Sequence, residues 1–70
     1  MHKLSEYVEM AADEYFEETG EVELKAVWTA EFFAGGGVQE EYPQQDLVAF
    51  HELVQKALLR KAAARARLGK

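Results

Sequence analysis

Carboxylates are the chemically active side chains that this chain supplies most densely near its N-terminus. Five of them fall at helical spacing, which would place them on one face of a helix: Glu6, Glu9, Asp13, Glu14 and Glu17. A row of ionised carboxylates attracts basic groups, and Met10 among them could add an apolar contact. The pattern therefore predicts a binding face for a protein partner with a basic surface.

The same acidic face has a second interpretation. Glu17 and Glu18 lie near the predicted C-terminus of the helix, where the dipole disfavours negative charge, so helix stability does not explain them. They could belong to a solvated face that maintains solubility, compensated by basic residues at the C-terminal end of the same chain or of a dimer mate. The sequence is compatible with both interpretations.

Catalytic or metal chemistry has little support in the sequence. Ser5 is better explained as a helix N-cap, and His51 as a hydrogen-bonded residue at the edge of a helix. Glu31 could face Glu40 or Glu41 across a hairpin, but thirteen acids in 70 residues produce such neighbours by chance. Because cysteine is absent, neither a disulfide nor a thiolate zinc site can form. We expect no enzymatic activity, no metal and no cofactor.

Charge is divided along the chain. Residues 1–46 hold twelve acids and two bases, net −10, whereas residues 47–70 hold one acid and six bases, net +5, in agreement with the overall −5. Four of these bases would share a narrow arc of a C-terminal helix: Lys56, Arg60, Arg67 and Lys70. Such an arc could contact a phosphate backbone, which makes nucleic-acid binding an alternative function. Because the rest of the chain is acidic and would repel nucleic acid, we expect a protein partner instead.

Periodicity predicts the elements that must position these groups. Residues 4–19 show the 3-4-3 apolar spacing of an amphipathic helix, which Gly20 would end. Residues 22–33 alternate between apolar and polar side chains, which predicts a strand. A shorter strand is predicted over residues 38–42, after a turn of three glycines.

A second helix is predicted over residues 43–68, with Pro43 at its first position and Asp46 in its first turn. The expected fold is α+β: a single domain over residues 1–70 in the order helix–strand–strand–helix (αββα). Both helices would pack on one face of an antiparallel β-hairpin, since two strands alone are marginally stable.

The apolar stripe of the second predicted helix stops early. Its inner line consists of Leu47, Phe50, Val54, Ala57 and Leu58. The next positions on that line are Lys61 and Arg65. We therefore expect the last two or three turns to extend beyond the core or to lie in a groove of a partner.

Further apolar residues predict association. Val27 and Phe33 fall on the polar face of the predicted long strand and could anchor a partner. A second flank of the C-terminal helix could form a dimer or second interface: Val48, Leu59, Ala62 and Ala66. The long first strand would also leave an open edge, which a homodimer could close.

The chain contains no run of about 18 apolar residues and no apolar N-terminal stretch, so we expect a cytoplasmic protein that does not enter a membrane. In general outline, the expected architecture resembles compact accessory proteins of phages and mobile elements. The resulting hypothesis is a non-enzymatic protein-binding module, a small inhibitor or adaptor. A nucleic-acid-binding protein or a structural assembly protein is the alternative.

Overall fold

The computed structural model describes residues 3–68, and all the regular secondary structure in this part of the chain is helical, without a strand. Its four helices are α1 (Leu4–Thr19), α2 (Ala26–Gly35), α3 (Val38–Glu41) and α4 (Leu47–Leu68). The predicted α+β fold with its β-hairpin is therefore wrong. Both predicted strands, over 22–33 and 38–42, are replaced by a connection and two short helices. The open strand edge that suggested a homodimer is lost with them.

Helix α1 spans the range that the apolar spacing predicts, but its N-cap differs. The helix follows Lys3, whose backbone N–H donates to Glu6 Oε1 at 2.9 Å. Ser5, the predicted N-cap, lies inside the first turn and is exposed. At the other end Gly20 adopts φ 69° and donates its N–H to the Phe16 carbonyl at 2.9 Å, as expected for a glycine that ends a helix.

The alternation over residues 22–33 is misleading because it combines two different structures. Val22 and Leu24 belong to a non-helical connection, in which Leu24 is buried and Val22 is exposed. From Ala26 onward the segment is apolar on nearly all sides, so any chosen period finds apolar matches. The residues buried on α2 are Thr29 and Phe33, four positions apart, which is the spacing of a helix face.

The three glycines form the turn between α2 and α3. Gly35 is the last residue of α2, and the Gly36 N–H donates to the Phe32 carbonyl at 2.8 Å. Gly37 has φ +91°, a conformation that other residues adopt only with strain, and it precedes α3. Val38, at the start of α3, is fully buried. The turn therefore redirects the chain into the core instead of returning it as a strand.

Helix α4 begins at Leu47, four residues after the predicted start. Asp46 is its N-cap: one carboxylate oxygen, Oδ2, accepts from the Ala49 N–H at 3.1 Å. Pro43 lies in the preceding turn, which the Gln45 N–H closes on the Tyr42 carbonyl at 2.9 Å.

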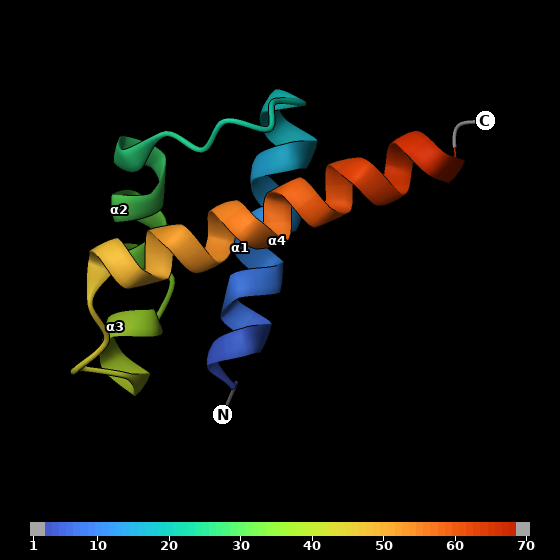
Figure 1. The fold of residues 1–70 in the computed structure, drawn as a ribbon. Helices are drawn as coiled ribbons and strands as arrows, with labels where there is room; N and C mark the ends of the chain where they lie inside the picture. Colours follow the sequence, from blue (N-terminus) through green and yellow to red (C-terminus); the bar gives the residue numbers. More distant parts are fainter. Residues whose placement is uncertain (1–2, 69–70) are drawn as a thin grey trace.

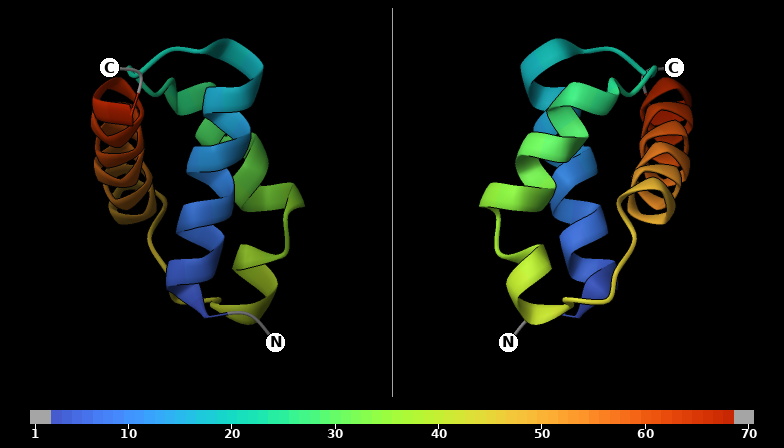
Figure 2. Two further views of the ribbon diagram at one scale, coloured as in Figure 1. Left: turned by 90° about the vertical axis from the view of Figure 1, so that its right-hand side faces the viewer. Right: turned by 90° about the vertical axis from the view of Figure 1, so that its left-hand side faces the viewer.

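The four helices form two layers. Figure 1 shows α4 lying across α1, with α2 and α3 beside α1 at the end where α4 begins. Figure 2 shows α4 as one layer over the other three helices. The molecule is elongated, 41 × 23 × 17 Å, because the last turns of α4 continue beyond α1. Within residues 3–68, no helix combines the length and the apolarity needed to cross a bilayer.

The core lies where the two layers meet. Phe50 of α4 is fully buried and contacts Phe33 and Phe32 of α2, with ring centroids 5.3 and 6.3 Å apart. On the α1 side, Tyr15 packs edge-on against Trp28 at 5.1 Å. Most of the predicted inner stripe of α4 is confirmed as core, since Phe50, Val54, Ala57 and Leu58 are at most 1% exposed. Leu47 is the exception and is 37% exposed.

Candidate protein-binding surface

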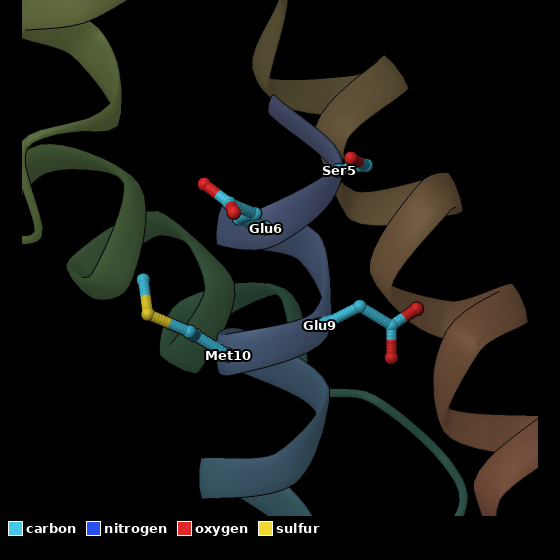
Figure 3. Close-up of a pocket in the computed structure, with 4 residues that line it drawn as sticks. All are labelled: Ser5, Glu6, Glu9 and Met10. Atoms are coloured by element: carbon cyan, nitrogen blue, oxygen red, sulfur yellow. The ribbon is translucent and has the colours of Figure 1, made fainter. Parts of the chain in front are cut away.

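The face of α1 that points away from the core is acidic and exposed. We call it the α1 outer face; it consists of Glu6, Met10, Asp13, Glu14 and Glu17, all exposed. Figure 3 shows Glu6 and Met10 pointing away from α4, beside a shallow depression of about 370 Å³ that Ser5 and Glu9 complete. Met10 is 40% exposed in the middle of this row. Five of the eight residues predicted to contact a partner thus share one accessible face.

Glu9 is turned toward α4 and pairs with bases of the same chain. Its Oε1 lies 2.9 Å from Lys61 Nζ, and its Oε2 lies 3.6 Å from Arg60. The same Lys61 ammonium contacts Asp13 Oδ1 at 2.8 Å, and these carboxylates raise the pKa of Lys61, Asp13 more than Glu9. Basic residues of the C-terminal helix therefore compensate the negative charges of Glu9 and Asp13. Within residues 3–68, Glu14 and Glu17 form no ion pair.

The basic residues that interrupt the inner stripe of α4 face α1. Lys61 takes the position after Leu58 and meets carboxylates, as described above. One turn later the Arg65 guanidinium lies 5.2 Å from the centre of the Phe16 ring, a cation–π contact. Where the stripe changes from apolar to basic, Lys61 thus faces acidic side chains of α1 and Arg65 faces an aromatic ring. Residues 63–67 are exposed, in line with the expectation that the end of α4 leaves the core.

The predicted anchors Val27 and Phe33 lie in different environments. Val27 is 73% exposed on α2, outside the α1 outer face. Phe33 is only 5% exposed and packs against Phe50, so its assignment to a partner-binding site is wrong. A period of two predicts a solvent-exposed strand face for Phe33, whereas the period of a helix puts its side chain in the core.

The second flank of α4 is partly covered. Val48 and Leu59 are 65% and 50% exposed, Ala62 is half-buried and Ala66 is exposed. Leu47 and Val48 border a small apolar hollow of about 170 Å³ with Ala26 and His51.

Gln55, on the same flank, holds the α1–α2 connection. Its Oε1 accepts from the Leu24 N–H at 2.9 Å, and its Nε2 donates to the Val22 carbonyl at 2.7 Å. Tyr15 adds a third bond through its hydroxyl to the Glu23 carbonyl at 2.7 Å. Side chains from α1 and α4 therefore satisfy backbone groups that have no secondary-structure partner.

The basic arc predicted for nucleic acid is exposed where it is described. Lys56, Arg60 and Arg67 lie on the side of α4 that faces away from the core, although Arg60 also reaches Glu9. Lys70 lies outside the described residues. The arc is interrupted at Ala63, which is exposed as well.

The acidic residues and the histidine that could have served catalysis do not form a common site, and the histidine has a structural role. Because there is no hairpin, Glu31 on α2 does not face Glu40 and Glu41 across a turn of two strands. His51 Nδ1 lies 2.9 Å from Thr29 Oγ1, which confirms a hydrogen-bonded histidine at the edge of the helix. The fully buried Thr29 hydroxyl also bonds to the Lys25 carbonyl at 3.2 Å.

A hydrogen bond between a tyrosine and a glutamate, which the sequence did not predict, joins α1 to α3. The buried Tyr7 hydroxyl of α1 donates to Glu41 of α3, and the ring packs edge-on against Tyr42 at 6.3 Å. The hydrogen bond to Glu41, with a contribution from burial, raises the pKa of Tyr7 to about 12. Among residues 3–68, no three His, Asp or Glu side chains converge as a metal site requires.

No protein-family model, curated protein or solved structure matches this chain.

Proposed function

We propose that this chain is a non-enzymatic protein-binding module, an inhibitor or adaptor, that docks the α1 outer face on a basic surface of another protein in the cytoplasm. The observation that carries the proposal is the position of Glu14 and Glu17, which are exposed beside Met10 and form no ion pair within residues 3–68. Charged residues of this kind speed and orient encounter, and an apolar side chain among them contributes affinity.

Two rows of carboxylates on α1 differ in what they do. The row next to α4, Glu9 and Asp13, holds Lys61 and so contributes to the contact between the helices. Glu14 and Glu17 form no ion pair within residues 3–68, and Glu17 lies close to the C-terminal end of the helix dipole, where it costs stability. Because these two carboxylates are not held by bases of residues 3–68, they can pair with basic groups of a partner.

The test is comparative capture from a lysate of the native host, followed by binding measurements with the purified partner. One bait carries Glu14→Lys and Glu17→Lys. The control bait carries Glu21→Lys and Glu31→Lys, two exposed acids outside the outer face, so that the net charge of the two baits is equal. Circular dichroism should show both variants folded, because replacing Glu17 by a base improves the interaction with the dipole.

We expect a protein with a basic surface that the wild type and the control retain and the outer-face variant loses. Its affinity should fall as salt rises, since the contact is between exposed charges. Equal capture by all three baits would contradict the proposed site. Binding of DNA or RNA with a steep salt dependence, lost on changing Lys56 and Arg67, would replace this function by the nucleic-acid alternative.

A further inference from the structure

Two exposed stripes of this chain have the same residue spacing. On α1 the stripe is Glu6, Met10, Asp13 and Glu17, and on α4 it is Lys56, Arg60, Ala63 and Arg67. Both step by four, three and four residues, the spacing with which two helices pack along a shared seam. All eight residues are exposed. Within residues 3–68, Glu17, Lys56 and Arg67 form no ion pair, whereas Glu6 accepts from the Lys3 N–H, Asp13 pairs with Lys61 and Arg60 reaches Glu9. Because all eight side chains are exposed, both stripes can still meet a second molecule.

The stripes are complementary in only one direction. If the helices run antiparallel, Glu17 meets Lys56, Asp13 meets Arg60 and Glu6 meets Arg67. In the same register Met10 meets Ala63, the one small residue in the basic row, which leaves room for its side chain. If the helices run parallel, Met10 meets Arg60 and Asp13 meets Ala63, and only two acid–base pairs remain. Antiparallel helices also align their dipoles favourably.

We propose that the basic surface recognised by the α1 outer face is the α4 stripe of a second copy of this chain. The inference rests on the proposed function and names its partner. The chain already shows the same chemistry internally, since Lys61 of α4 binds Glu9 and Asp13 of α1. Within one molecule α4 crosses α1 (Figure 1), and the ion pairs between the two helices join Glu9 and Asp13 to Lys61 and Arg60. Within residues 3–68, Glu17 and Lys56 form no ion pair with each other.

The residues involved retain capacity for this contact. Lys61 holds Oδ1 of Asp13, whose side chain is still 64% exposed. Arg60 is 71% exposed and its contact with Glu9 is long, at 3.6 Å. Because the contact is between exposed charges with one apolar residue at its centre, it should be weak and sensitive to salt. After one contact, one copy keeps its basic stripe unused and the other keeps its acidic stripe, so the contact is heterologous and can repeat.

The experiment measures mass by sedimentation velocity from micromolar to millimolar concentration. The wild type should associate at low salt and dissociate at about 1 M salt, where charges are screened beyond about 3 Å. Glu17→Lys alone and Lys56→Glu alone should each weaken self-association about tenfold or more, because an attraction becomes a repulsion. Neither residue forms an ion pair within residues 3–68, so the fold should be unaffected.

Mixing the two variants provides the decisive arm. Glu17 of the Lys56→Glu chain would meet Lys56 of the Glu17→Lys chain, so the 1:1 mixture should associate although neither chain does so alone. The charge-matched controls Glu31→Lys and Lys25→Glu, both at exposed positions, should associate as the wild type does.

A wild type that stays monomeric at low salt overturns this inference but leaves the proposed function standing if lysate capture depends on Glu14 and Glu17. Self-association that Glu17→Lys does not weaken, or a mixture that fails to associate, also overturns it. If lysate capture is insensitive to the outer face while the mixture associates, docking on another protein is overturned, and the inference stands with the second copy as the partner of the outer face.

Discussion

Lys61 Nζ lies 2.8 Å from Asp13 Oδ1, at the point where the apolar stripe of α4 ends. The side chain is 27% exposed, so the ion pair is at the edge of the core and not within it. With Glu9 as a second acceptor, this lysine extends the contact between α1 and α4 beyond the last buried leucine.

Replacing Lys61 by alanine should reduce stability by roughly 0.5–1 kcal/mol at low salt, the upper range for partly exposed ion pairs. The loss should shrink at about 1 M salt, because screening weakens the pair that the mutation removes. Urea unfolding at two salt concentrations measures both effects. The control is Lys56→Ala, which removes an exposed lysine that forms no ion pair within residues 3–68 and should cost little stability. A loss that is independent of salt would show that Lys61 acts through packing of its stem.

Gln55→Ala should destabilise the protein by about 1–2 kcal/mol, because the Leu24 N–H and the Val22 carbonyl lose their partners. Gln55→Glu keeps the acceptor for Leu24 but loses the donor to Val22, so an effect between those of wild type and alanine is expected. Hydrogen exchange of the Leu24 amide is the direct measurement and should accelerate in the alanine variant. Gln39→Ala, at an exposed position of α3, is the control. Unchanged exchange at Leu24 would rule out the bond.

Tyr7 should make stability depend on pH in the alkaline range. Its pKa is about 12 in the folded protein, above its ordinary value of 10, because its hydroxyl donates to Glu41. Above pH 10 the unfolded chain releases this proton while the folded chain retains it, so stability falls as pH rises from 10 toward 12. The contribution is complete below pH 10.

The variant Tyr7→Phe should be less stable than the wild type at neutral pH, and the difference should narrow between pH 10 and 12. Thermal unfolding across this range measures the difference, and the absorbance of ionised phenol should lose a titration step near pH 12 in the variant. A constant stability difference from pH 8 to 12 would contradict the assignment.

The glycine junction gives opposite predictions for neighbouring residues. Gly35→Ala should be neutral or stabilising by up to about 1 kcal/mol, because Gly35 ends α2 and a new Cβ there meets nothing within 4 Å. Gly37→Ala should destabilise by about 1 kcal/mol or more, because alanine is strained at φ +91°. Thermal unfolding of both variants checks the pair. Equal effects at the two positions would contradict a helix that ends at Gly35.

The sequence correctly predicts the first and last helices but wrongly predicts two strands between them. The reason is the contrast in polarity between the two faces of a segment, which is clear in α1 and weak in α2. In α1 acids and apolar residues separate cleanly, so period and burial agree, and Gly20 ends the helix as expected. In residues 26–35 nearly every position is apolar, and a period of two or of four fits equally well. The pair Thr29 and Phe33, with Trp28 and Phe32 beside it, was the signal for a helix.

The candidate surface was predictable in part. Periodicity placed Glu6, Met10, Asp13, Glu14 and Glu17 on one face of α1, and the structure leaves that face exposed. It could not show that Glu9 and Asp13 are held by Lys61, since a helical wheel locates residues on their own helix and says nothing of which helix lies opposite. The roles of Gln55 and Tyr7 were missed for the same reason, as their partners lie 31 and 34 residues away.

By itself the sequence determined the acidic N-terminal helix, the basic C-terminal helix and the inner stripe that joins them, because local spacing and composition encode these features directly. Only the tertiary structure decided that residues 26–35 and 38–41 are helical, that Phe33 is core, and which charges are neutralised within the molecule. These three features depend on the crossing of α4 over α1, which brings residues distant in the chain into contact and decides which opposite charges meet. That crossing leaves one acidic stripe and one basic stripe facing outward.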